Sequence, residues 1–139
     1  MLSLAGREAD IVSINAKTTS AGWLDFDSIT AERTAEKIGW VREAAGARFD
    51  ALELNMLASE VTVTDDRRGA ARDSLTRRKL PADEASIDRW IDSPPNFIGS
   101  VNEIVDLMQM RRERYGISYI SMFEPMEPCL PVVKRLVGQ

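Results

Sequence analysis

The chain has 139 residues and a formal net charge of -4, with 44% hydrophobic and 29% charged residues, a composition typical of one folded domain rather than a disordered chain. No apolar run approaches the ~18 residues that cross a bilayer, and the negative charge gives no long-range attraction to phosphate backbones. We therefore expect a cytoplasmic domain without a membrane or nucleic-acid partner.

The sequence contains no histidine, and Cys129 is its only cysteine. This excludes, within the chain, a serine–histidine–aspartate triad, a cysteine–histidine pair, histidine-ligated zinc and an internal disulfide. Cys129 lies in a proline-flanked turn without a neighbouring base, so we expect an inert thiol. Acid–base chemistry would have to come from carboxylates, lysine, tyrosine, this thiol or a bound cofactor.

The first third of the chain predicts a helix end, a strand and a helix. Residues 1–8 form a helix so short that it is marginal without packing, which suggests a truncated chain. Residues 9–15 (ADIVSIN) are an apolar run typical of a buried parallel strand, with Ser13 and Asn15 toward its carboxyl end. Residues 30–45 carry an apolar stripe at helical spacing that stops at a glycine, which predicts a helix.

The middle of the chain predicts a strand followed by two helices and a linker. Residues 51–64 (ALELNMLASEVTVT) alternate in hydrophobicity with a slip near Ala58, which predicts one long strand or a strand with a bulge. Asp65 and Asp66 resemble a paired carboxylate motif, but their place before a polar run favours helix capping. That helix should reach Leu80, and a second helix over 82–91 and a rigid linker over 93–96 should follow.

A group of arginines in this middle region could indicate a phosphate site. The group lacks a glycine-rich turn and is interleaved with acidic residues, which favours a solvated outer helix. Its members are Arg67, Arg68, Arg72, Arg77 and Arg78.

Residues 99–125 predict a helix that leads directly into a strand. Ser100 and Glu103 have capping-box spacing, and Gly116 is placed to end the helix in the left-handed conformation. Residues 117–123 (ISYISMF) are β-branched and aromatic without strict alternation, which predicts a strand covered on both faces. Residues 129–137 should form a last amphipathic helix.

Alternation of helices and strands predicts the α/β class with a parallel sheet and right-handed crossovers. Three strands alone would leave two apolar, unpaired edges, so something should cover those edges. Ligands of such sheets sit at the carboxyl ends of the strands, where Ser13, Asn15, Phe123 and Glu124 are expected. The alternatives are a loop-capping role for Ser13 and Asn15, and for Glu124 a solvated strand end or a bond to the next helix.

Several segments together resemble the carboxyl-terminal part of the luciferase-like monooxygenase family, most closely its actinobacterial deazaflavin-dependent branch. The segments that carry the resemblance are LAGREADIVSIN, TAERTAEKIGWVREAAGARFDALELNM, VTVTDD, FIGSVNEIVDLMQMRRERYGISYISMFEP and PVVKRLVG. The family's fold is a TIM (β/α)8 barrel, and the matching part supplies strands six to eight with their helices. The resemblance implies that residues 1–139 are a single partial barrel domain, in which strands one to five have no counterpart.

The resemblance also implies a cofactor and a reaction. Deazaflavin coenzyme F-420, or alternatively flavin mononucleotide (FMN), would lie at the carboxyl ends of the strands and support hydride transfer or monooxygenation of a small-molecule substrate. In a barrel, Ser13 and Asn15 would face the cofactor, while Phe123 and Glu124 are candidate substrate-binding residues. No catalytic residue and no metal ligand carries over, because the family's usual acid–base residues lie in the strands without a counterpart. We therefore expect this chain alone to be inactive or weakly active. The alternative function is a non-catalytic assembly module, which completes a barrel as a homo-oligomer or with a separate amino-terminal half.

Overall fold

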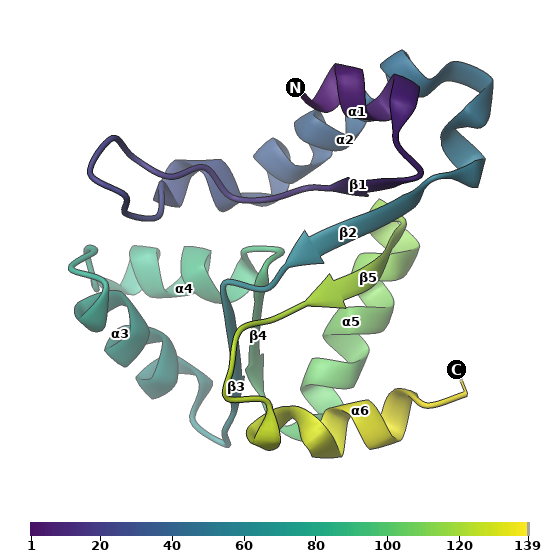
Figure 1. Ribbon diagram of the computed structural model, residues 1–139. Coiled ribbons are helices and arrows are strands. Elements are labelled where there is room, and N and C mark those ends of the chain that lie inside the picture. The colour runs from purple at the N-terminus through teal and green to yellow at the C-terminus, as the bar shows by residue number, and fades with distance from the viewer. Residues whose placement is uncertain (139) are drawn as a thin grey trace.

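The computed structural model describes residues 1–138, in which helices and short parallel strands alternate (Figure 1). The α-helices are α1 (Leu2–Glu8), α2 (Ala31–Ala45), α3 (Arg67–Arg77), α4 (Glu84–Asp92), α5 (Val101–Tyr115) and α6 (Leu130–Leu136). The strands are β1 (Ile11–Ser13), β2 (Glu53–Leu57), β3 (Glu60–Val63), β4 (Asn96–Gly99) and β5 (Ile117–Ser121). Three short 3-10 helices, η1 (Phe26–Ile29), η2 (Gly46–Ala51) and η3 (Glu127–Cys129), join these elements. No helix in residues 1–138 is long and apolar enough to cross a bilayer.

The strands form two separate parallel sheets. One sheet has the order β1-β2-β5, and the other pairs β3 with β4. The expected α/β class with parallel strands is therefore confirmed. Within the described residues, the two sheets do not join into a closed barrel, and β1 and β5 are the outer strands of the larger sheet.

Helices cover only one face of the three-stranded sheet. Alternate side chains of β1 and β2, such as Val12 and Leu54, pack in one core cluster with Ile38 and Val41 of α2 and with Tyr115 at the end of α5. On the opposite face Ile11, Ser13, Glu53 and Tyr119 are exposed, and Figure 1 shows no helix in front of the sheet. A sheet with both faces covered would have apolar residues at consecutive positions, whereas the apolar residues of this sheet lie mainly on one face.

The helix boundaries follow the capping residues that the sequence predicts. Ser100 and Glu103 form a reciprocal capping box at the start of α5, and Gly116 ends that helix with φ 72°. Thr30 accepts a hydrogen bond from the Arg33 amide at the start of α2, and Asp66 caps α3. The capping interpretation of Asp66 is thus confirmed, although α3 ends at Arg77 rather than at Leu80 as expected.

The prediction of one strand over residues 51–64 is wrong, because this segment contributes a strand to each sheet. The Ala58 amide still donates to the carbonyl of Ser121 at the end of β5 (2.8 Å), whereas the Ser59 amide donates to the carbonyl of Pro95, next to β4 (2.8 Å). The backbone therefore changes hydrogen-bonding partner between Ala58 and Ser59. The slip in the alternation marks a change of sheet, not a bulge.

The predicted rigid linker over 93–96 is also wrong in part. Residues 93–95 form a turn, but Asn96 begins β4, and all four residues of that strand are buried. Arg111, itself 3% exposed, holds this turn by donating to the carbonyls of Ser93, Pro94 and Asn96. The two prolines before the strand favoured a linker, whereas β4 is buried because it packs on α4 and α5.

The last strand is shorter and more open than predicted. β5 ends at Ser121 instead of Phe123, and Ser118 and Tyr119 are exposed, with Tyr119 46% exposed. The prediction of cover on both faces is wrong because β5 is an outer strand of a sheet whose second face carries no helix.

Candidate functional site

A polar cluster centred on Asn55 joins all three strands of the larger sheet. Ser13 Oγ donates to Asn55 Oδ1 (2.7 Å), and Asn55 Nδ2 donates to the carbonyl of Tyr119 (3.1 Å) and to Ser121 Oγ (3.3 Å). Asn55 is only 6% exposed, whereas Ser13 is exposed. The cluster lies toward the carboxyl ends of β1, β2 and β5, where ligands of parallel sheets bind.

Strand register explains why these residues meet. Ser13 pairs with Asn55 across β1 and β2, and Asn55 pairs with Tyr119 across β2 and β5. Because side chains alternate along a strand, a residue next to Val12 or Leu54 points away from the helices. The polar cluster therefore occupies the uncovered face, with Ile11 (50% exposed) on the same face.

The predicted cofactor residue Ser13 lies in this cluster, but Asn15 does not. Asn15 Oδ1 accepts a hydrogen bond from the Leu57 amide (3.1 Å), and its carbonyl accepts one from Lys37 Nζ (2.7 Å). Lys37 also donates to the carbonyl of Ser28 (2.8 Å). These two oxygens of Asn15 thus hold the chain just after β1 to its neighbours, and a cofactor contact of Asn15 stays a prediction.

Lys37 is a buried cation that the sequence interpretation missed. It is 6% exposed and donates to these two backbone carbonyls, and burial lowers the pKa of its ammonium group. Its spacing from Thr34 and Val41 places it on the apolar stripe of α2, and that spacing was the available signal.

The predicted substrate residues lie beyond the end of β5 and outside the polar cluster. Phe123 is 71% exposed, and Glu124 is exposed and makes no ion pair with any residue of the described 1–138 segment. The structure does not bring these two residues into the network of Ser13 and Asn55. Ser121 reaches that network instead.

Asn55 and Ser121 were missed by the sequence interpretation. The signal was present in the alternation of ALELN, which puts Leu52 and Leu54 on a common face and Asn55 on the other. A parallel register that places Asn55 beside Ser13 would have pointed to the pair. The register depends on long-range packing, so the pattern of one strand does not determine it.

A second buried polar cluster lies around Glu60 in β3. Its carboxylate accepts hydrogen bonds from the Ser74 hydroxyl, from Trp90 Nε1 (3.2 Å) and from Thr62 Oγ1 (2.8 Å), and Arg77 lies 3.9 Å away. These donors come from α3, α4 and β3 itself, so the buried carboxylate ties both helices to the strand. Such a satisfied network is the ordinary way to bury a charge.

The arginine group of residues 67–78 behaves as a charged outer surface. Arg68 pairs with Glu84 and Asp88, and Arg72 pairs with Glu84, all on the exposed sides of α3 and α4. The favoured interpretation as a solvated helix face is confirmed for these two arginines. Arg78 differs, because it donates to the carbonyl of Ser59 and lies over the Trp90 ring.

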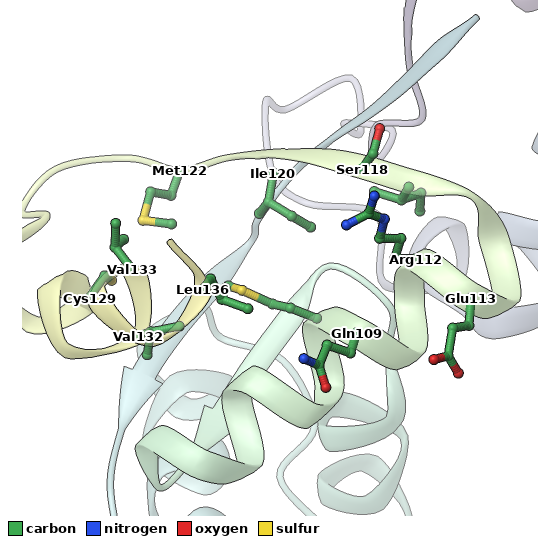
Figure 2. Close-up of a pocket in the computed structure, with 12 residues that line it drawn as sticks. Gln109, Arg112, Glu113, Ser118, Ile120, Met122, Cys129, Val132, Val133 and Leu136 are labelled. Carbon is green, nitrogen blue, oxygen red and sulfur yellow. The ribbon is translucent and has the colours of Figure 1, made fainter. Parts of the chain in front are cut away.

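A groove of about 860 Å³ opens between α5, β5 and α6 (Figure 2). It lies on the helix-covered side of β5, since Ile120 in its wall pairs with the buried Met56, whereas Asn55 pairs with Tyr119. Cys129, 3% exposed, is part of the wall, and burial raises the pKa of its thiol. This environment keeps the thiol protonated and fits the inert role expected of it. No group of three potential metal ligands occurs among the residues that the structure describes.

Comparison with known proteins gives one structural neighbour. No protein-family model matches the sequence, and no curated protein matches it. The structure is similar to the crystal structure of monooxygenase RslO1 from Streptomyces bottropensis, with a TM-score of 0.55 and 17% sequence identity. The likeness covers 96% of this chain and 41% of that chain, so this chain spans less than half of its neighbour. At this identity the likeness shows a shared α/β fold alone.

Proposed function

We propose that this chain is the carboxyl-terminal part of a luciferase-like oxidoreductase barrel that uses deazaflavin coenzyme F-420 or FMN. The observation that carries the proposal is a parallel sheet with helices on one face and a polar cluster on the other. An open doubly wound sheet carries helices on both faces, whereas a (β/α)8 barrel has an outer ring of helices and side chains directed inward. An arc of three barrel strands would have this one-sided cover.

The free edges of the sheet fit the same proposal. β1 and β5 each have one strand neighbour in the described residues, and the paired strands are parallel. As strands six, seven and eight of a barrel, β1, β2 and β5 would pair at their outer edges with strands five and one. The similarity to a protein named as a monooxygenase supports the oxidoreductase class.

The uncovered face suits the ring of such a cofactor better than its phosphate. Ser13 Oγ gives its proton to Asn55, so its lone pairs can accept a hydrogen bond from a ring N–H. When bound, the cofactor would supply the hydride transfer or oxygen activation. The residues on this face are Ile11, Ser13, Glu53, Asn55, Leu57, Tyr119 and Ser121, and none of them is a cation. The phosphate would therefore need residues from another part of the barrel.

The first test is a fluorescence titration of the 139-residue chain with coenzyme F-420 and with FMN, with its mass in solution measured alongside. Saturable binding that Ser13→Ala weakens and the exposed Ser20→Ala leaves unchanged would support a pocket at the strand ends. No binding of either cofactor by a folded chain would refute the claim that this chain alone holds the cofactor. The same titration after adding a separate amino-terminal half tests the complete barrel.

A second candidate function is a non-catalytic assembly module. Several large apolar residues are exposed after β5 and along α6, beside the free edge of the sheet, and such a surface commonly marks an interface. They are Phe123 (71% exposed), Met126, Leu130, Val133 and Val137. A dimer that Leu130→Asp dissociates and Leu4→Asp on α1 leaves intact, without cofactor binding, would favour this candidate.

A further inference from the structure

The groove between α5, β5 and α6 has an apolar wall that is separate from the polar cluster. Ile117 and Ile120 of β5 line one side, Met108 of α5 a second, and Val133 and Leu136 of α6 a third. Its volume of about 860 Å³ falls in the range of ligand pockets, roughly 300–1,000 Å³. Met108 and Met122 both line the groove, and Figure 2 shows the Met122 side chain extending from the end of β5 toward α6. Unbranched methionine side chains can adjust to a flexible apolar ligand.

One end of the groove carries the guanidinium group of Arg112. The guanidinium of Arg112 lies beneath β5, near Ser118, and is directed along the groove toward Ile120 (Figure 2). Among residues 1–138 no carboxylate lies within ion-pair distance of Arg112. Glu113 also lines the groove, but in Figure 2 its carboxylate points away from Arg112. This arrangement joins an apolar trough to a single available positive charge.

We propose that this groove binds an amphipathic carboxylate, with its head group on Arg112 and its alkyl chain along α6. A planar guanidinium binds a carboxylate through two parallel hydrogen bonds, which fixes the head at one end. The aliphatic wall that extends from Ile120 to Leu136 then selects an unbranched apolar chain rather than a second polar group.

Chain length gives the proposal a quantitative signature. Each methylene group transferred from water into the groove should raise affinity by about fourfold, so octanoate should bind roughly 16 times more tightly than hexanoate. The gain should stop once the chain fills the trough beside Leu136. A surface that held only the head group would show no dependence on chain length.

The decisive measurement is isothermal titration calorimetry with hexanoate, octanoate and decanoate below their micelle concentrations, with methyl decanoate as the uncharged analogue. We expect one decanoate per chain, and at least about tenfold weaker binding for the methyl ester and for Arg112→Ala. Arg7→Ala is the matched control, since it removes one exposed positive charge from α1 and should leave binding unchanged. Val133→Phe, at a 44% exposed position in the groove wall, should weaken binding by occupying the trough.

Four results would overturn the proposal. Equal affinity for decanoate and its methyl ester, or equal loss in Arg112→Ala and Arg7→Ala, would show that Arg112 does not hold the head group. Absence of binding by a folded monomer would show that the groove is not a ligand site. Absence of decanoate binding by a chain that is a folded dimer would show that a second copy covers the groove instead. The F-420 and FMN titrations have no bearing on these outcomes, because the cofactor face is the other side of β5.

Discussion

Replacing Asn55 by alanine should strongly destabilise the three-stranded sheet. The change removes three hydrogen bonds, one from Ser13 and two to β5, at a position that is 6% exposed. At a net contribution of about 1 kcal/mol for each bond, the free energy of unfolding should fall by about 3 kcal/mol. With an m value of about 2 kcal/mol/M, the urea midpoint should fall by roughly 1.5 M. Ser13→Ala removes one of these bonds and should cost about 1 kcal/mol.

Asn55→Asp removes the two hydrogen-bond donors of Asn55 while keeping the volume of its side chain. The aspartate keeps an acceptor for the Ser13 hydroxyl but loses both donors and brings a carboxylate against the carbonyl of Tyr119. It should therefore be at least as unstable as Asn55→Ala. A double-mutant cycle of Ser13→Ala with Asn55→Ala should give a coupling of about 1 kcal/mol, whereas the cycle with Asn55→Asp should give a coupling near zero because the acceptor is kept. Urea unfolding followed by circular dichroism measures the stability of each variant. An aspartate variant as stable as the parent would refute the claim that the amide donors hold β5 to β2.

Three further predictions concern stability. Glu60→Ala should cost about 3 kcal/mol in urea unfolding because it leaves the buried indole N–H of Trp90 without its acceptor, whereas Glu60→Gln should cost less. Gly6→Ala should lower the melting temperature, because the added Cβ would lie 2.8 Å from a backbone carbonyl of α2. Gly39→Ala adds its Cβ in open space within that helix and should raise the melting temperature. Equal shifts in the two variants would contradict the close packing at Gly6. Hydrogen bonds from Ser100 lower the pKa of Glu103, so the folded state binds that proton less tightly than the unfolded chain. The stabilisation from the Glu103 carboxylate is present above its unfolded pKa and is lost as the pH falls through its folded pKa. Glu103→Gln should therefore weaken the fall in unfolding free energy at acid pH. An unchanged acid dependence would argue against this role of Glu103.

Local signals were sufficient where the structure is local. The capping box of Ser100 and Glu103, the left-handed Gly116 and the stripe of α2 each depend on residues within a few positions of one another. Their hydrogen bonds form within one turn of helix, so the sequence pattern and the observed boundaries agree. The α/β class followed from the order of these elements.

The errors fall where the chain changes neighbours over long sequence distances. An alternating pattern continues from β2 into β3, and it holds no information about the change of partner from β5 to β4 at Ser59. The two partners lie about 40 and 60 residues away along the chain. Similarly, Asn96 was assigned to a linker because its burial depends on packing under α4 and α5. Periodicity describes which side of a strand is apolar and says nothing about which strand it joins.

The candidate site shows the same division between local pattern and register. Ser13 was identified from its place at a strand end, while Asn55 was missed because its importance arises from lying beside Ser13 and Tyr119 at once. Arg112 lies near the end of α5, and it lines a groove only because β5 and α6 lie beside that helix. β5 therefore has two chemically different sides, a polar one at Tyr119 and Ser121 and an apolar one at Ile120. A substitution at Ile120 should weaken carboxylate binding in the groove without changing the hydrogen bonds of the polar cluster at Ser13. A substitution at Ser121 should change the polar cluster without changing carboxylate binding. Separate responses of this kind would establish two sites on one strand, whereas a shared response would reduce them to one unstable edge.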